Sequence, residues 1–231
     1  TMRQEHNIDI LSVLSYANEC EDMSAQNLIM MAYKAQNPID VYAFAGLHYH
    51  LPGQNKDADE VFNQLIKFMD MGYDGFKRVE SIPWIRKLIG NIPMDSPIYD
   101  KFYDYLEKNN IPIFWHVGDP AFYWDKEKCP QQIIDIGWSY FDGTFVTLEE
   151  LYSEVENVMS RYPKLRIVFD HFYFMSKDLE RAADFLERWP TVYFTFTPGS
   201  EMYFNFSKYP GKTKDFFVKY QNRLLFGTDM G

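Results

Sequence analysis

Short apolar runs alternate along the chain with stretches in which apolar residues recur every three or four positions. Near-continuous apolar runs are typical of parallel strands covered on both faces, and the recurring spacing predicts amphipathic helices. We expect strands at residues 8–15, 40–47, 74–80, 112–117, 165–171, 191–196 and 223–228, and helices at 58–70, 97–109, 148–161, 177–188 and 212–221.

This order of strand and helix predicts one α/β domain over residues 1–231. Strands that alternate with helical patterns indicate a parallel sheet, and the length suits a (β/α)₈ TIM barrel. Such a barrel has eight strands, and the pattern supplies seven. Because the chain begins before a strand with a helix-like tail and ends two residues after Asp229, we expect it to be truncated at both ends, with one strand preceding Thr1 and one helix following Gly231.

Three polar residues stand at the carboxyl ends of predicted strands. His116 ends the run Pro112-Ile-Phe-Trp-His116, His171 follows Ile-Val-Phe-Asp, and Asp229 follows Leu-Phe-Gly-Thr. Catalytic residues of TIM barrels come from the C-terminal ends of several strands. Two imidazoles and a carboxylate are a composition typical of a metal site. We therefore predict that these side chains meet at the mouth of the barrel.

The longest irregular stretch, residues 116–147, follows the strand that carries His116. Loops of this length in a compact domain are usually functional. We expect this one to form a lid or a wall of the substrate site.

Composition narrows the class of partner. Hydrophobic residues make up 46% of the 231 residues, enough for one large core, and the net charge is −10. That charge argues against nucleic acid and anionic membranes, which attract basic surfaces. No apolar run reaches the 18 residues of a membrane-spanning helix, and the two distant cysteines, Cys20 and Cys129, are expected to be reduced thiols. We expect a cytoplasmic protein with a small-molecule substrate, and a homo-oligomer is compatible with this.

The strand-end motifs together resemble the amidohydrolase superfamily. Arg223-Leu-Leu-Phe-Gly-Thr-Asp229, Pro163-Lys-Leu-Arg-Ile-Val before Asp170-His171, and the His116 strand are similar in order and spacing to the "amidohydrolase 2" branch. That branch contains metal-dependent hydrolases and decarboxylases of the aminocarboxymuconate and resorcylate type. The resemblance spans nearly the whole chain.

The resemblance implies a metal site and assigns strands to it. In the family, a His-x-His pair on strand one, histidines on strands five and six and an aspartate on strand eight hold the metal, and some members add a glutamate or modified lysine on strand four. Asp229 then ends strand eight, His171 strand six and His116 strand five, while 74–80 becomes strand four. The strand-one pair is absent from the seven strands. The implied cofactor is a divalent ion, zinc first and manganese second.

Four further residues are candidates near the mouth. Glu80 is a candidate metal ligand, because lysine and glutamate are rarely buried without a partner and it ends the strand-four run. Lys77 is a candidate contact for a substrate carboxylate. His48 and His50 share one face of a strand end but belong to strand three, so we expect substrate contacts from them rather than metal ligation. Asp170 should point away from His171 in a regular strand.

The resemblance implies hydrolysis of a C–N or C–O bond by metal-activated water, with Asp229 as the general acid–base. Three alternatives stay open. The first is a metal-dependent decarboxylase of an aromatic or unsaturated acid, and the second is a non-catalytic barrel that binds a small molecule. The third is a metal-free carbohydrate-active barrel that pairs Glu80 with Asp119 or Glu201.

Overall fold

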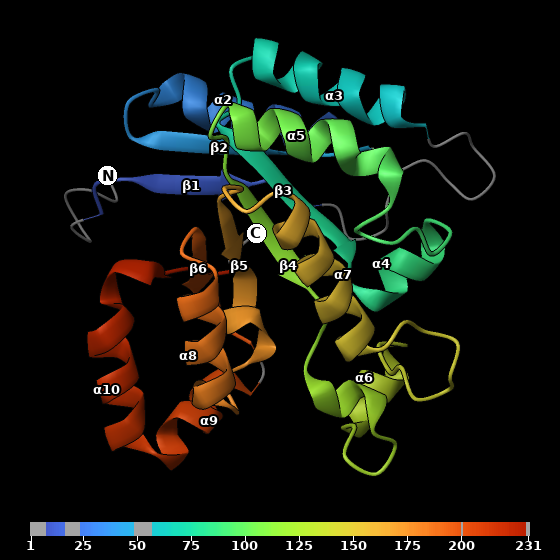
Figure 1. Cartoon of the computed structure of the whole chain (residues 1–231), viewed down its shortest axis with the longest axis vertical. Coiled ribbons are helices and arrows are strands. Elements are labelled where there is room, and N and C mark those ends of the chain that lie inside the picture. Colours follow the sequence, from blue (N-terminus) through green and yellow to red (C-terminus); the bar gives the residue numbers. More distant parts are fainter. Residues whose placement is uncertain (1–7, 17–23, 49–56, 200, 230–231) are drawn as a thin grey trace.

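The computed structural model describes residues 8–16, 24–48, 57–199 and 201–229, and one parallel sheet forms its centre (Figure 1). The strands lie side by side in chain order, and every neighbouring pair is parallel. This arrangement confirms the predicted α/β class and the existence of all seven predicted strands. They are β1 (Leu11–Leu14), β2 (Val41–Gly46), β3 (Gly75–Ser81), β4 (Ile113–Val117), β5 (Ile167–Phe169), β6 (Val192–Thr195) and β7 (Leu224–Leu225).

The five predicted helices are present close to their expected bounds. Helix α7 begins with the capping box formed by Thr147 and Glu150, which satisfies two backbone donors reciprocally. These helices are α3 (Ala58–Asp70), α5 (Asp100–Lys108, preceded by the 3₁₀ turn η1, Pro97–Tyr99), α7 (Leu148–Arg161), α8 (Leu179–Arg188) and α10 (Pro210–Tyr220). No helix of the described residues is long and apolar enough to cross a membrane.

Four other helices in the described part of the chain were not predicted. Helix α2 follows β1 and leaves Leu28, Ile29 and Tyr33 exposed by 61%, 46% and 52%, which blurs its apolar stripe. The other three are seven residues or shorter and lie within connections, where periodicity carries little signal. The four are α2 (Ser24–Gln36), α4 (Pro83–Leu88), α6 (Gln131–Asp135) and α9 (Met202–Lys208).

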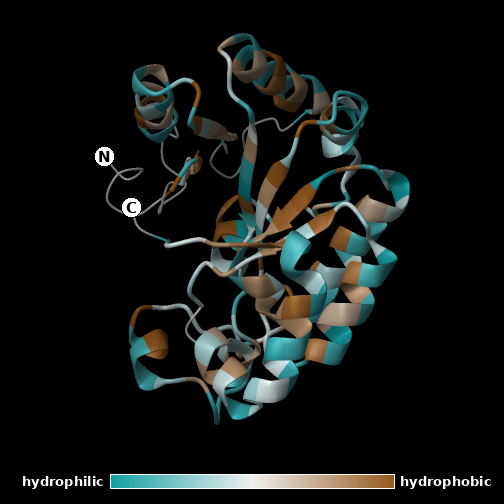
Figure 2. Cartoon of the chain, turned by 90° about the vertical axis from the view of Figure 1, so that its left-hand side faces the viewer, coloured by the Kyte–Doolittle hydropathy of each residue, from teal (hydrophilic) through white to brown (hydrophobic). Residues whose placement is uncertain are grey.

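Each face of the sheet has its own apolar layer. On the outer face, the main core joins strands and helices through fully buried residues such as Phe76, Trp115 and Phe169. On the inner face, Phe44, Phe114 and Val168 form a smaller cluster. In Figure 2 most of the central strands are coloured as hydrophobic, whereas the helices around them alternate between hydrophilic and hydrophobic residues. Of the polar residues on the inner face, His116 lies beyond this cluster on β4, whereas Lys77 of β3 pairs in register with Phe114.

A substitution at Phe102 tests the assignment of the core on the outer face of the sheet. Its ring is fully buried and packs edge-on against Phe76 with centroids 5.1 Å apart. We expect Phe102→Ala to lower the free energy of unfolding by about 3–5 kcal/mol, because burial is lost and a cavity remains. Urea denaturation measures this change. The matched control is Phe204→Ala: this ring is 66% exposed, and a change beyond about 0.5 kcal/mol there would contradict the assignment of the core.

Candidate functional site

The structure brings His116 and His171 together, as predicted. His116 lies on β4, and His171 follows β5 by two residues. Their ring centroids are 4.6 Å apart at an interplanar angle of 67°. The side chain of His116 is 14% exposed and His171 is 7% exposed. The pair therefore sits at the mouth end of the inner face, largely shielded from water.

A left-handed turn places His171. The four residues from His171 to Phe174 have φ between 50° and 56°, a region that residues with a Cβ adopt at a cost of about 1–2 kcal/mol each. The predicted strand 165–171 therefore ends at Phe169. Phe174, half-buried, stacks on His171 at 5.3 Å and lies 5.6 Å from His116. The turn thus supplies one imidazole and an aromatic ring beside both.

The same turn brings Asp170 to the site, contrary to the expectation that it faces away. Strand alternation stops at Phe169, so consecutive residues no longer alternate. Asp170 forms a buried ion pair with Lys77 of β3 and lies 3.5 Å from the Thr195 hydroxyl. Burial alone would raise the pKa of Asp170, but the charges of Lys77 and His171 hold that pKa below its usual value.

The two imidazoles use different ring nitrogens to face backbone carbonyls. His171 Nδ1 faces the carbonyls of Thr197 and Pro198 at 3.2 and 3.1 Å, and His116 Nε2 faces the Gly118 carbonyl at 3.0 Å. A nitrogen that faces a carbonyl carries the proton. The network therefore assigns the unprotonated nitrogens as Nδ1 of His116 and Nε2 of His171.

The surroundings favour a neutral His116. Burial, followed by the charges of His171 and Lys77, lowers its pKa well below the usual value, while Asp170 and Asp229 act in the opposite direction. A neutral imidazole is the form that binds a metal. Asp229 is exposed, has φ of 55° and follows β7. Its charge is the last-ranked of the contributions to the pKa of His116.

These residues fit a divalent metal as part of its ligand set. A metal-ligating histidine typically donates its second nitrogen to a carbonyl or carboxylate, and both imidazoles do so. Within the described ranges, however, no group of three or more His, Cys, Asp or Glu side chains is arranged to hold an ion. The pair therefore provides two candidate ligands and leaves the rest of the coordination to other groups.

Glu80, a predicted metal ligand, is engaged elsewhere. It is fully buried and forms an ion pair with Arg78, two residues before it on β3. The Arg78 guanidinium lies 4.3 Å from the ring centre of Tyr99 and 5.0 Å from that of Trp115, in the helix-side core. The structure thus places Glu80 in an internal ion pair on the outer face of the sheet rather than with the two imidazoles.

Of the three predicted substrate-contacting residues, one lies at the site, one lies elsewhere and one is outside the described residues. Lys77 stands at the site through its pair with Asp170. His48 stacks on Phe68 at 5.9 Å, and its backbone bonds the Gln64 side chain; it therefore packs against α3. His50 lies outside the described residues.

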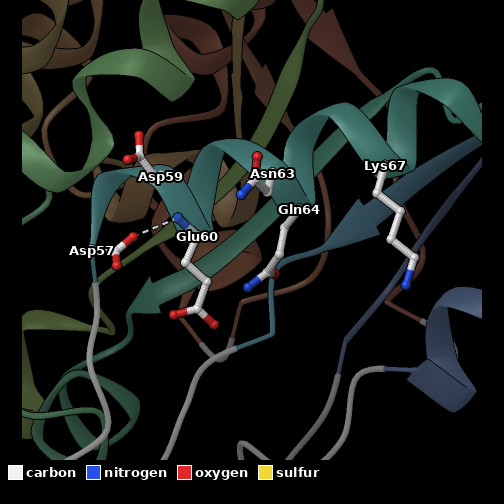
Figure 3. Close-up of a pocket in the computed structure, with 6 residues that line it drawn as sticks. All are labelled: Asp57, Asp59, Glu60, Asn63, Gln64 and Lys67. Atoms are coloured by element: carbon white, nitrogen blue, oxygen red, sulfur yellow. Dashed lines mark hydrogen bonds between the residues drawn. The ribbon is translucent and has the colours of Figure 1, made fainter.

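A separate hollow runs along α3 and is not part of this arrangement (Figure 3). The side chains drawn there all belong to α3 or its N-cap, where Asp57 accepts a hydrogen bond from the Glu60 backbone at 2.7 Å. None of the predicted catalytic or metal residues lines it. The lining residues are Asp57, Asp59, Glu60, Asn63, Gln64 and Lys67.

Asp119 is a site residue that the sequence analysis considered only as half of a carboxylate pair. It is 8% exposed, and one oxygen lies 3.9 Å from His116 Nε2. Tyr140 donates a hydrogen bond of 2.7 Å to the other oxygen. Burial raises the pKa of Asp119 to about 7, against the lowering effects of Tyr140 and His171. Its position three residues after His116 was the available signal.

The sequence of the chain matches the model of a known protein family. A family model described as Amidohydrolase matches residues 55–230, about three quarters of the chain. The chain belongs to this amidohydrolase family. The resemblance to the "amidohydrolase 2" branch is thereby confirmed. No curated protein sequence matches this chain significantly.

Solved structures show the same fold at low identity. A 2,6-dihydroxybenzoate decarboxylase from Rhizobium matches with a TM-score of 0.60 at 16% identity, over 99% of this chain and 75% of its own. A dihydroxybenzoic acid decarboxylase from Polaromonas with bound manganese gives 0.55 at 15%, over 99% and 73%. A TIM-barrel protein from Bordetella bronchiseptica gives 0.54 at 16%, over 87% of this chain, which spans only 58% of that protein. The TIM-barrel prediction is confirmed.

The contribution of the Lys77–Asp170 ion pair to stability can be measured. The two side chains are 8% and 3% exposed. We expect Asp170→Asn to lower the free energy of unfolding by about 3–5 kcal/mol, because Lys77 keeps a buried, uncompensated charge. The double variant Lys77→Met with Asp170→Leu should recover most of this loss in urea denaturation. Equal destabilisation by the single and double variants would contradict a charge-based origin.

Glu80→Gln separates a structural role from metal ligation. Arg78 would lose its buried partner, so we expect a loss of about 3–5 kcal/mol in unfolding free energy. We expect the metal content of the folded variant, measured by elemental analysis, to equal that of the wild type. A folded Glu80→Gln chain that has lost its metal would restore Glu80 as a ligand.

Proposed function

We propose that the chain carries a metal-dependent active site of the amidohydrolase type, which hydrolyses a C–N or C–O bond of a small molecule. The observation that carries this proposal is the buried pair of imidazoles, His116 and His171, whose hydrogen bonds leave Nδ1 of His116 and Nε2 of His171 available. Neutral imidazoles and a carboxylate are ligands that zinc and manganese share.

The proposed metal ligands are His116, through Nδ1, and His171, through Nε2, together with Asp229. An ion bound there would lower the pKa of a bound water toward neutrality and would polarise a substrate carbonyl. Zinc is the first candidate and manganese the second. The manganese of the Polaromonas decarboxylase supports the second.

The remaining chemistry belongs to side chains of this chain. Asp229 is exposed beyond β7, so its carboxylate can accept a proton from water and return it to the leaving group. The Lys77 ammonium has three donors, and Asp170 takes one of them. A second N–H of Lys77 can therefore donate to a substrate oxygen, as proposed from the sequence.

Decarboxylation of a planar acid is the second candidate. The specific observation in its favour is Phe174, whose ring lies within 5.6 Å of both imidazoles and offers a flat apolar contact. Two of the similar structures are named as dihydroxybenzoate decarboxylases. In this reaction Asp229 would donate its proton to the carbon that loses CO₂, while Lys77 would contact the carboxylate.

Metal content tests the site before any substrate is known. We expect about one zinc or manganese per chain in the wild type, and a loss of this metal with retained folding in both His116→Ala and Asp229→Asn. Elemental analysis measures the metal content, and circular dichroism measures the folding. Once a substrate is known, turnover of Asp229→Asn should fall at least about 10²-fold. The control is Asp59→Asn, an exposed carboxylate on α3. A wild-type chain without metal even after reconstitution would contradict the proposal and favour a non-catalytic barrel.

A paired substrate screen separates the two reactions. The manganese- and zinc-loaded chains are incubated with amides, esters and lactones on one side and with hydroxybenzoates on the other. Release of amine or acid supports hydrolysis, and release of CO₂ supports decarboxylation. Either activity should disappear when a chelator removes the metal, and activity that survives the chelator would contradict a metal-dependent mechanism.

A further inference from the structure

A buried carboxyl group links His116 to the segment that follows β4. Asp119 places one oxygen 3.9 Å from His116 Nε2 and accepts the Tyr140 hydroxyl at 2.7 Å on the other. Asp119 and Tyr140 are 8% and 2% exposed. The carboxyl group therefore lies between an imidazole of the candidate site and a phenol from 21 residues later in the chain.

Tyr140 is held in place by an aromatic cluster within residues 118–147. Its ring lies 4.8 Å from Trp124 and 4.9 Å from Phe145, and its backbone N–H donates to the Tyr123 carbonyl at 2.8 Å. Trp124 in turn donates to the Val146 carbonyl at 3.0 Å. Packing on several sides leaves the Tyr140 hydroxyl little freedom, so its hydrogen bond holds the Asp119 carboxyl in one orientation.

The same side of His116 faces a second acceptor. The Gly118 carbonyl lies 3.0 Å from Nε2, and Gly118 adopts a φ of 75°. A Cβ at this position would meet Leu148 at 2.5 Å, so the backbone path that presents the carbonyl requires glycine. Two acceptors on one side of the ring favour the proton on Nε2.

We propose that Asp119 and Tyr140 are positioning residues for His116. Tyr140 orients the Asp119 carboxyl, and this carboxyl keeps His116 in the Nε2-protonated tautomer, which leaves Nδ1 to bind the metal. A metal-ligating histidine typically donates its second ring N–H to a carbonyl or a carboxylate. Here the Gly118 carbonyl accepts at 3.0 Å, and the Asp119 oxygen at 3.9 Å adds its negative charge on the same side. The claim that Nδ1 binds a metal rests on the proposed function. The claim that Asp119 and Tyr140 favour the Nε2-protonated tautomer does not.

Nitrogen-detected NMR of the histidine side chains tests the tautomer without any metal. At pH 8.5, the ratio of Nε2–H to Nδ1–H in His116 should fall at least roughly tenfold in Asp119→Ala, because the negative charge 3.9 Å from Nε2 is lost. Tyr140→Phe should shift the ratio in the same direction by less. His116→Ala identifies the resonance among the five histidines.

The control removes an equivalent phenol elsewhere. Tyr73 is 3% exposed and donates to the Asn27 carbonyl at 2.5 Å, so Tyr73→Phe should leave the His116 ratio unchanged. An unchanged ratio in folded Asp119→Ala and Tyr140→Phe would overturn the proposal and assign the tautomer to Gly118 alone. If Asp119→Ala does not fold, Tyr140→Phe decides.

Titration with Mn²⁺ provides the second measurement. Loss of a carboxylate behind a ligating histidine typically weakens metal binding about 10–100-fold, so we expect this loss in Asp119→Ala and wild-type affinity in Tyr73→Phe. Unchanged Mn²⁺ affinity in Asp119→Ala would contradict the positioning role. A wild-type chain that binds no Mn²⁺ contradicts the proposed function instead, and the tautomer ratio then decides the role of Asp119.

Discussion

The candidate site depends on the left-handed turn from His171 to Phe174. Four residues with a Cβ in this conformation cost several kcal/mol together. The compensation is visible in the core: Phe172 and Tyr173 are fully buried, and the Tyr152 hydroxyl donates to the Tyr173 carbonyl at 2.9 Å. Conformational strain held in place by surrounding packing is typical of functional sites. Here it turns Asp170 and His171 toward the same inner face.

The buried charges around this turn follow from its geometry. Because Asp170 faces inward, it can compensate Lys77, whose position on β3 would otherwise leave an ammonium group buried alone. On the outer face, Arg78 and Glu80 compensate each other in the same way. Neighbouring residues of one strand thus send two ion pairs to opposite faces, and only the inner pair can influence the imidazoles.

Sequence periodicity was enough for the strands, the main helices and the meeting of His116 with His171, because parallel strands of a barrel open toward one mouth. The periodicity gave wrong predictions where the backbone leaves the regular strand conformation. Asp170 was expected to face away, and nothing in Asp170-His-Phe-Tyr-Phe174 signals positive φ, since none of these residues is glycine. Glu80 was expected at the site because burial of a charge suggests function, but Arg78 on the same face offered a structural partner.

The internal packing of the segment after β4 favours a fixed wall over a mobile lid, the two roles expected from the sequence. Its aromatic side chains form a small core of their own, and Trp138 stacks on Trp84 of α4 with centroids 6.5 Å apart. A lid must exchange its contacts with water at little cost, whereas opening this segment would expose several large rings at about 1.5–3 kcal/mol for each buried side chain. A fixed wall also suits the proposed role of Tyr140 and Asp119. The hydrogen bond from Tyr140 can hold the Asp119 carboxyl beside His116 only if the Tyr140 ring itself does not move.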